Sequence, residues 1–592
     1  MTSRPQSSRA GSRTWQVTSP DWAPVWVARA VAVVGLLGII GAGLPMAARV
    51  DVVPELILGV APHAARAATI AVGMLLLMLA RGLRRRKRRA WQLAVVFTAA
   101  EGALHLARDL DLPQAVVTVL LLVLLLITRS AFTGVPDPRS RRNTGVVFVS
   151  AAVMAIAVGF AAILLDSDSI VGYPTTWQVT QEVLLGLVGL SGPLHFHHVH
   201  HADFVAITLA LLGGVVVLST LAAALRPPGG PHGLRREDEA RLRDLLDQPG
   251  HHDSLGYFAL RRDKSAIFSP TGKAAICYRV VDGVSLAAGD PLGDPEAWPG
   301  VIDAWLAEAR RYAWVPAVLA PSERGASAFH RAGLDALELG DEAVVRVADF
   351  TLEGRAMRSV RQAVGRARRL GYTVDIRPVA ALSGAELAEA QEASDRWREG
   401  TQERGFAMAL GRFGDPEDTG CVLVRCRDAG GELSALLHFV PWGQDGLSLD
   451  LMRRSPDSDN GIVELMVVDL LTGDPSTGGH PRRLRRVSLN FAVFRSVLER
   501  GGRLGAGPVL RLWRQLLLHA SRFWQIESLY RANAKYQPDW VPRYLCFRNS
   551  RDLPQVSVAA LRAEAFLSAP AFLPRLRPRP GTPVEHLQHE LS

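Results

Sequence analysis

The sequence predicts a multi-spanning α-helical membrane domain followed by a mixed α/β part, in which two units are joined by a basic helix. The 592-residue chain is longer than a single domain, and its hydrophobic fraction of 48% is unusual beside 67 Lys and Arg residues. Long apolar runs occupy the chain before residue 226, whereas shorter alternating segments mixed with charge follow it. These two patterns place the membrane domain first.

The charge balance favours a polyanionic partner. A formal net charge of +10 points to nucleic acid or to an anionic membrane surface, and charge alone does not choose between them. The four cysteines include no CxxC pair, so we expect reduced, buried thiols and no zinc site.

Six apolar segments are expected to span the membrane within a domain over 22–226. A span needs about 20 apolar residues to cross the hydrocarbon core, which the first, fifth and sixth segments satisfy, while the third and fourth are short. A count of five or seven stays open. The preceding residues 1–21 are rich in Ser, Arg and Gly and are expected to form a disordered cytoplasmic tail. The six segments are 25–47, 54–80, 91–106, 113–128, 146–165 and 204–225.

Basic loops predict the orientation of these spans. Arginines and a lysine fill 81–89 between the second and third segments, and Arg139, Arg141 and Arg142 lie between the fourth and fifth. Because Lys and Arg are retained on the cytoplasmic side, both loops are inside if the N-terminus is inside. An even number of spans returns the chain to the cytoplasm at Arg226. Both termini of a multi-pass cell-membrane protein are therefore expected in the cytoplasm.

Two groups of ionisable residues in the membrane domain have alternative interpretations. The tract 195–201 holds five histidines, which can bind a transition metal, but only Asp203 accompanies it, so a pH-sensitive or plain solvated loop is favoured. Glu101 and His105 lie four residues apart in the third segment. Either they line a polar path for a lipid head group, or Glu101 simply lies near the membrane interface. We expect no metal.

The remainder of the chain is expected to contain two α/β units of similar size. A linker over 227–236 contains the breaker run Pro227-Pro228-Gly229-Gly230-Pro231. The first unit covers 237–350, a basic connecting helix 351–372, the second unit 373–567, and a Pro/Arg-rich tail 568–592. A duplication fits this arrangement, although no repeat of residues is visible.

The connecting helix carries the densest positive charge. Its arginines cover a broad arc, and phosphate binding is the natural use of such an arc, because each neutralised phosphate releases counterions. The alternative is a helix that packs its Ala and Val stripe and hydrates its arginines. Gly371 is the expected C′ residue of this helix. The arginines are Arg355, Arg358, Arg361, Arg366, Arg368 and Arg369.

Segment 362–367 of the same helix is similar to the Q/R-x-x-G-x-G/A loop with which acetyltransferases of the GNAT fold hold the acyl-CoA pyrophosphate. That loop follows a strand and opens a helix, where free backbone N–H groups bind anions. Here the motif falls in the middle of a helix, so the similarity is weak.

Lys535 lies at a predicted helix-to-strand corner. A helix-like run from Arg522 ends at this lysine, and two prolines within 538–542 then force an extended exit towards a strand that begins near Arg543. Such corners often project side chains into clefts. The alternative is a surface lysine beside an aromatic cluster.

Eight short motifs follow one another through the α/β part. Together with several membrane spans, they resemble the lysylphosphatidylglycerol synthetase family, also called multiple peptide resistance factors, over roughly 237–567. Eight pieces in the right order are a strong resemblance where one would be weak. The motifs are Gly289-Asp290-Pro291; Asp341-Glu342-Ala343; Arg369-Leu370-Gly371-Tyr372; Trp397 with 403–406; 448–453; Asn460-Gly461 with Glu464; Leu489-Asn490-Phe491; and 530–538 with Trp540 and 543–545.

The resemblance implies two GNAT-like acyltransferase domains. They would transfer an amino acid, with lysine expected, from aminoacyl-tRNA to the glycerol hydroxyl of phosphatidylglycerol at the cytoplasmic leaflet. The product is a cationic lipid that lowers the negative charge of the membrane and confers resistance to antimicrobial peptides. No cofactor is expected, and a homo-oligomer is left open.

Three departures from the family pattern limit what the resemblance implies. Ala407 and Ala409 stand where relatives often carry Ser and Gly, so the resemblance does not define the details of the substrate. Six spans are fewer than in relatives with a complete flippase, so lipid flipping is not expected. Some actinobacterial relatives carry a fused lysyl-tRNA synthetase after the transferase; we expect charged tRNA to come from elsewhere.

The resemblance and the chemistry of ester transfer suggest roles for individual residues. The expected catalytic residues are Lys535, Asp450 and Glu464, in which the two carboxylates bind the lysyl amines or act as general base and Lys535 stabilises the oxyanion or the lipid phosphate. Residues expected to bind the aminoacyl group or the lipid are Arg453, Asn490, Arg543, Glu403 and Tyr530. The arginines of the connecting helix are expected to bind tRNA.

Two other functions compete with this interpretation. A CoA-dependent acetyltransferase would use the same fold, although the displaced pyrophosphate motif argues against it. A non-enzymatic membrane transporter or sensor with an inert cytosolic part is the other. It predicts that Lys535→Ala leaves the lipid composition unchanged.

Overall fold

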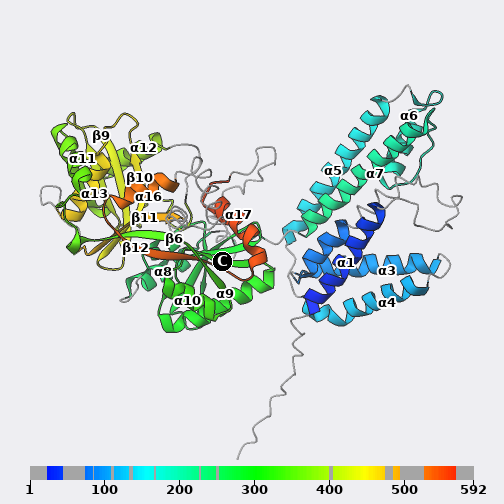
Figure 1. The fold of residues 1–592 in the computed structure, drawn as a ribbon, viewed down its shortest axis with the longest axis horizontal. Helices are drawn as coiled ribbons and strands as arrows, with labels where there is room; N and C mark the ends of the chain where they lie inside the picture. Colours follow the sequence, from blue (N-terminus) through cyan, green and yellow to red (C-terminus); the bar gives the residue numbers. More distant parts are fainter. Residues whose placement is uncertain are drawn as a thin grey trace, which may run out of the picture. The chain divides into compact units, whose positions relative to one another are not determined.

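The computed structural model describes residues 23–43, 74–84, 86–107, 112–132, 138–165, 169–225, 229–231, 233–248, 253–398, 405–473, 484–493 and 526–567. The expected tails 1–21 and 568–592 and the expected binding residue Glu403 lie outside these ranges. The chain divides into two compact units, Met1–Gly230 with Trp305–Val315 and Pro231–Ala304 with Pro316–Ser592 (Figure 1).

Helices occupy five of the six segments expected to span the membrane, and residues 74–84 are helical at the end of the second segment. Within the described ranges, Thr144–Leu165 and His200–Ala224 are long and apolar enough to cross a membrane. Helix α6 was not expected from the sequence. The helices are α1 (Ala23–Gly43), α3 (Arg88–Ala107), α4 (Leu112–Ile127), α5 (Pro138–Leu165), α6 (Thr176–Leu187) and α7 (Val199–Ala224).

Helices α5, α6 and α7 pack around a small apolar cluster. Its buried members include Ile163 on α5, Val183 on α6 and Leu209 on α7. Gly186 on α6 approaches α7 so closely that a Cβ atom there would lie 2.4 Å from Leu209. Small residues permit such close contacts between apolar helices, which are stabilised by van der Waals packing.

The C-terminal unit is built on one twelve-stranded sheet with the order β1-β2-β3-β5-β12-β6-β11-β10-β9-β8-β7, and β4 pairs with β2. Strands β10 and β11 are parallel, so the chain between them must cross over the sheet. The strands are β1 (Ser265–Phe268), β2 (Ala274–Val281), β3 (Val284–Ala288), β4 (Leu292–Gly293), β5 (Val315–Leu319), β6 (Asp335–Arg346), β7 (Thr373–Pro378), β8 (Val422–Arg427), β9 (Leu433–Trp442), β10 (Gly446–Arg454), β11 (Arg486–Val493) and β12 (Asp539–Phe547).

The helices of this unit cover both faces of the sheet. Val424 on β8 belongs to the buried cluster that α11 and α13 cover, whereas its strand neighbour Arg427 lies on the other face and pairs with Glu389 of α12 at 2.6 Å. The helices are α8 (Arg236–Asp247), α9 (Trp298–Tyr312), α10 (Glu323–Arg331), α11 (Arg358–Arg369), α12 (Gly384–Arg396), α13 (Ile462–Thr472), α16 (Ile526–Ala534) and α17 (Leu553–Ala563).

The sheet has two halves with the same order of elements, and the last strand of each half pairs with strands of the other half. The first half runs β3, α9, β5, α10 and β6, and the second runs β10, α13, β11, α16 and β12 in the same style. Strand β6 pairs with β11, while β12 lies between β5 and β6 (Figure 1). Residues of both expected units, 237–350 and 373–567, therefore contribute to one continuous sheet in one compact unit.

Helix α11 ends as its sequence predicts. Gly371 has a φ of +86° and occupies the C′ position. Its N–H donates to the Arg368 carbonyl at 3.1 Å, and the Tyr372 N–H donates to the Ala367 carbonyl at 3.2 Å. These two bonds are the Schellman arrangement, which satisfies the last carbonyls of a helix. The helix begins at Arg358, so Arg355 precedes it.

A buried charge network holds β12 against β6. Arg543 on β12 is 3% exposed, and its guanidinium donates to Glu342 at 2.5 and 3.0 Å and to Asp253 at 2.7 Å. The Ser254 hydroxyl and the Ala320 carbonyl accept its remaining bonds. All five guanidinium N–H groups therefore have acceptors.

We predict that Arg543→Gln destabilises the fold by about 3–5 kcal/mol, because it leaves the buried carboxylates of Glu342 and Asp253 without their counter-charge. Arg346→Gln is the matched control. Its partner Asp539 lies 2.7 Å away, but both side chains are more than half exposed, so the loss is at most about 1 kcal/mol. The thermal unfolding of the detergent-solubilised chain measures both variants. Equal unfolding temperatures for the two would contradict the prediction.

Candidate active site

The candidate site forms where strands β10 and β11 separate. Their parallel register ends at the pair Ser448 and Ser488. Beyond it, β10 carries a bulge between Leu449 and Leu451, and β11 shifts its register against β6 before Phe491. A bulge leaves one residue unpaired and bends the strand. The sheet therefore opens at this point.

The opening holds a cavity of about 390 Å³. Apolar side chains from β9, β10, α13 and β11 line it, and polar side chains come from β10, the start of α13 with the residues before it, and the end of α16. The apolar residues include Leu437, Leu449, Val467 and Leu489. The polar residues are Arg454, Asn460, Glu464, Asn533 and Lys535, with Tyr536 beside them.

Lys535 and Glu464 form an ion pair at this cavity. The lysine Nζ lies 2.8 Å from the glutamate Oε1, and the two side chains are 43% and 16% exposed. Glu464 lies in the first turn of α13, where the helix dipole favours negative charge. The pair therefore places a carboxylate and an ammonium group side by side in a partly buried position.

The presence of lysine at position 535 is informative in itself. Only four of the 67 basic Lys and Arg residues are lysines. An arginine stays charged in proteins, whereas a lysine is a compact charge that can lose its proton when its environment requires it. This signal was available in the sequence and supports the expectation that Lys535 is more than a surface residue.

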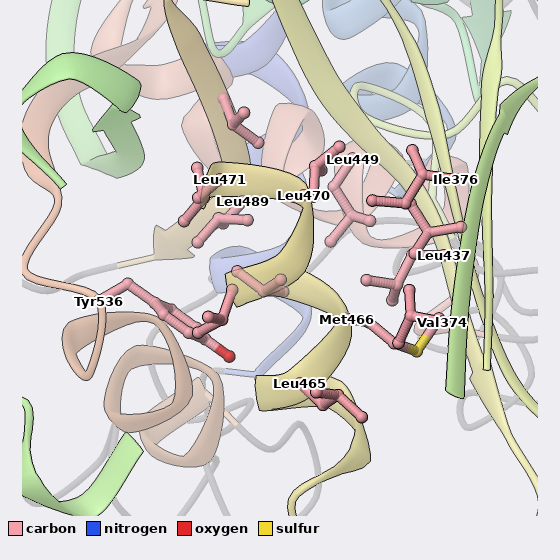
Figure 2. Packing of buried hydrophobic residues seen from close by; sticks show 14 of the residues in the cluster. Val374, Ile376, Leu437, Leu449, Leu465, Met466, Leu470, Leu471, Leu489 and Tyr536 are labelled. Carbon is pink, nitrogen blue, oxygen red and sulfur yellow. The ribbon is translucent and has the colours of Figure 1, made fainter. Parts of the chain in front are cut away.

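Two buried polar residues at the end of α16 line the cavity without having been predicted as site residues. Asn533 is 5% exposed, and its Nδ2 has no hydrogen-bond partner among the described residues. Burial, with the negative charge of Glu464, raises the pKa of the Tyr536 hydroxyl above its ordinary value, so this group stays protonated. Figure 2 shows the Tyr536 ring directed towards α13. The sequence could have indicated both, because Asn533 lies two residues before Lys535 and Tyr536 one residue after it.

Asp450 lies on the opposite face of the sheet. It is the bulged residue of β10, and its carboxylate lies 2.7 Å from the His438 Nδ1 and accepts the Leu410 N–H at 2.6 Å. His438 alternates along β9 with Leu437, which lines the cavity. The structure therefore separates Asp450 from Glu464, and Asp450 anchors the segment that contains Leu410.

The bulge also decides which of two adjacent arginines faces the cavity. Arg454 lines it together with Met452. Arg453 points to the other side of the strand and donates to the Met452 carbonyl at 3.2 Å. Arg453 is the arginine expected, from the resemblance and from guanidinium–phosphate chemistry, to bind the substrates. The bulge that places Arg454 at the cavity cannot be recognised from alternation of residue types.

The other expected binding residues are dispersed. Asn490 follows the cavity residue Leu489 on β11. The Tyr530 ring packs against Trp540, with ring centroids 5.3 Å apart. Arg543 lies in the buried network of β12 with every N–H group engaged, so the structure does not bring it to the cavity.

Helix α11 presents its arginines to solvent next to the cavity. Val360 and Val364 pack on the core, while the six expected arginines are exposed. Arg368 pairs with Asp469 at 2.8 Å. Gly461, which caps α13 with a φ of +108°, approaches α11 so closely that a Cβ there would lie 2.8 Å from the Ala363 carbonyl. The basic face of α11 thus begins beside the helix that carries Glu464.

The described residues offer no candidate metal centre. No group of three His, Cys, Asp or Glu side chains there could hold a metal ion. In the histidine tract, the His198 and His201 rings lie 6.0 Å apart, and both side chains are partly or fully exposed.

These observations define a membrane-associated α/β protein with a carboxylate–ammonium pair in an opened sheet. Residues 243–547, just over half of the chain, match the family model described as phosphatidylglycerol lysyltransferase, C-terminal. The chain therefore belongs to this family. Residues 19–225 match the transmembrane region of lysyl-tRNA synthetase, so the N-terminal part is a membrane region.

Relatives of similar sequence are longer than this chain. The lysylphosphatidylglycerol biosynthesis bifunctional protein LysX of Rhodococcus opacus is 43% identical over 88% of this chain and 47% of the relative. The protein of the same name from Mycobacterium marinum is 43% identical over 93% of this chain and 50% of the relative. The chain thus spans about half the length of these relatives.

Among solved structures, the C-terminal domain of a lysylphosphatidylglycerol synthetase from Agrobacterium fabrum is similar to this chain. It is 25% identical, covers 55% of this chain and 96% of its own, and has a TM-score of 0.46.

We predict that the pair formed by His438 and Asp450 stabilises the fold in a pH-dependent way. Burial opposes the charged imidazolium, but hydrogen bonds to Asp450 and Cys421 raise the pKa of His438 from 6.5 to about 10. A raised pKa gives stability that is complete below about pH 6.5 and is lost as the pH rises towards 10.

The comparison with His438→Gln tests this prediction. The variant lacks the titrating group, so the difference in unfolding temperature between it and the wild type should shrink from about pH 6.5 to about pH 10. A difference that is constant over this range would mean that His438 is neutral in the folded state.

Proposed function

We propose that this protein transfers lysine from lysyl-tRNA to the glycerol hydroxyl of phosphatidylglycerol at the cytoplasmic leaflet. The product is a cationic lipid that lowers the negative charge of the membrane. The observation that carries the proposal is the Lys535–Glu464 pair, 2.8 Å apart, at an apolar cavity within the segment that matches the lysyltransferase family. The names of the relatives, which refer to lysylphosphatidylglycerol biosynthesis, support lysine as the transferred amino acid.

The chemistry requires few groups because the donor ester is already activated. The protein must position the two substrates, take a proton from the glycerol hydroxyl and stabilise the tetrahedral oxyanion. Glu464 is the carboxylate at the cavity and takes the role of general base. Lys535 orients this carboxylate and supplies positive charge where negative charge develops. Asp450 supports the site from the other face, through its bond to Leu410.

The form of the cavity supports a lipid acceptor. Its lining includes the apolar side chains of Leu437, Leu449 and Leu489, while Arg454 and Asn460 join the ion pair among its polar groups. An apolar pocket with a few placed polar groups is typical of small-molecule sites. A guanidinium binds phosphate through two parallel hydrogen bonds, so Arg454 suits the phosphate of the lipid.

The tRNA is proposed to bind along α11. Its exposed arginines lie beside α13, which carries Glu464, and can neutralise phosphates of the donor. The same helix disfavours a CoA-dependent acetyltransferase. Gly365 of the pyrophosphate-like motif is inside α11, where backbone N–H groups are used by the helix itself.

The finer architecture belongs to the same proposal. The exchanged strands β6 and β12 and the matching order of elements support two GNAT-like halves that arose by duplication. The basic run 81–89, which lies where one helix ends and α3 begins, supports a multi-pass membrane region with both termini in the cytoplasm. In that orientation, charged tRNA and the inner leaflet are both accessible to the C-terminal unit.

The test is the transfer itself. Membranes that contain the protein are incubated with tRNA charged with labelled lysine, and label is expected in a chloroform-soluble, cationic lipid. Transfer from alanyl-tRNA or arginyl-tRNA alone would keep the reaction class and change the amino acid. Absence of lipid label from every charged tRNA would contradict the proposal, and so would stabilisation by acetyl-CoA but not by tRNA.

We predict that Lys535→Ala and Glu464→Gln each lower kcat by about 10²–10⁴-fold, since each removes a group that acts on charge or proton transfer in the transition state. Lys273→Ala is the matched control, because Lys273 is exposed directly before β2 and is not among the residues that line the cavity. The rate of labelled lipid formation measures all three. Wild-type activity in Lys535→Ala or in Glu464→Gln would show that the substituted residue takes no part in the transfer.

We predict that Arg358→Gln with Arg366→Gln weakens tRNA binding and reduces its salt dependence. The slope of log K against log salt should become shallower by about 0.7–0.9 per arginine that contacts a phosphate. Arg551→Gln, an exposed arginine after β12, is the control. Filter binding of tRNA over a salt series measures the slope. An unchanged slope would mean that α11 only packs its valines on the core and that its arginines are hydrated without binding tRNA.

A further inference from the structure

Asn533 is a buried polar residue whose side-chain N–H groups find no acceptor in the part of the chain that the structure describes. It is 5% exposed on the last turn of α16, and its side-chain Nδ2 has no hydrogen-bond partner among the described residues. Leaving a buried donor unsatisfied costs about 1–3 kcal/mol. Such groups are rare in folded proteins and require an explanation. A ligand that accepts its hydrogen bond is one.

The position of Asn533 supports this explanation. It lines the same cavity as Lys535 and Glu464. The chain turns sharply after it, since the Tyr536 N–H donates to the Asn533 carbonyl at 3.1 Å and Gln537 has a φ of +51°. This turn fixes the backbone that carries Asn533 and Lys535, and Tyr536 lines the cavity with them.

The ion pair and the amide differ in what they offer a substrate. The Lys535 ammonium already has Glu464 as a partner, whereas the Asn533 N–H has none among the described residues. A neutral amide donor does not titrate and does not attract a second carboxylate. It is therefore suited to an oxygen that is weakly negative in the substrate and strongly negative in the transition state.

We propose that Asn533 is a catalytic residue, whose side-chain N–H stabilises the oxyanion that forms on the carbonyl of the donor ester. This assignment rests on the transfer reaction proposed above. In that reaction, the glycerol oxygen bonds to the ester carbonyl carbon, and its proton passes to Glu464. The carbonyl electron pair moves to the carbonyl oxygen, which accepts the hydrogen bond from Asn533.

Collapse of this intermediate restores the carbonyl and breaks the bond to the ribose oxygen of the tRNA. That oxygen takes the proton back from Glu464. The products are uncharged tRNA and the aminoacylated lipid, so no further reactant is needed. Asn533 gains its strongest hydrogen bond only while the oxyanion exists, and its effect should therefore appear in kcat.

Asn533→Ala and Asn533→Asp test the proposal in the full-length protein, with labelled lysyl-tRNA and micelles that contain phosphatidylglycerol. Loss of one oxyanion donor should lower kcat by about 10²–10³-fold, with little change in the KM for the lipid. Asn533→Asp should be slower than Asn533→Ala, because a carboxylate of the same size repels the oxyanion. Asn549→Ala, at an exposed asparagine after β12, should keep wild-type activity.

Thermal unfolding separates this role from a structural one. Asn533→Ala removes an unsatisfied donor, so it should unfold at or above the temperature of the wild type while losing activity. A lowered unfolding temperature together with the loss of activity would overturn the proposal. So would a kcat close to that of the wild type, or a raised KM for the lipid with unchanged kcat, which would assign the amide to the lipid phosphate.

Failure of the underlying function is recognised separately. If the wild type transfers no amino acid from any charged tRNA, the proposed function fails, and the assignment of Asn533 fails with it. If the wild type is active and only the variants behave differently from the prediction, the assignment of Asn533 fails and the function stands.

Discussion

The separation of β10 from β11 is the constraint on which the candidate site depends. Hydrogen bonds join the two strands only as far as Ser448 and Ser488. Beyond that point the cavity lies where hydrogen bonds between the two strands would continue, and α13 places Glu464 in the lining of this cavity. The bulge at Asp450 supports this opening from the other face, because its carboxylate binds His438 and the Leu410 N–H. One irregularity in a strand thus shapes the pocket and anchors the chain behind it.

Local features of the site could be predicted from the sequence. Gly371 ends α11 because glycine adopts a positive φ without strain, and this end can be recognised from the local sequence. Lys535 lies at the end of a helix and before a strand, as expected from the prolines that follow it. The Ala and Val stripe of α11 likewise predicted which face packs on the core.

Features that depend on distant contacts could not be predicted in this way. Arg543 looked like a phosphate ligand, but its partners Glu342 and Asp253 lie 201 and 290 residues earlier in the chain. The bulge at Asp450 turns Arg453 from the cavity and Arg454 towards it, and no alternation of residue types reveals a bulge. The sequence does not single out Asn533 within its motif, because the missing acceptor for its Nδ2 among the described residues is visible only in the folded structure.

The insertion of β12 has a consequence for synthesis of the chain. Strands β5 and β6 lie next to each other in the sequence, yet the strand between them ends at residue 547. Until the ribosome has made that strand, each of the two exposes an unpaired edge, and unpaired edges invite association with other chains. The first half of the unit can therefore complete its sheet only after nearly all of the second half has been made. Long-range pairing of this kind folds slowly, so a nascent chain stalled before β12 would depend on chaperones to remain soluble.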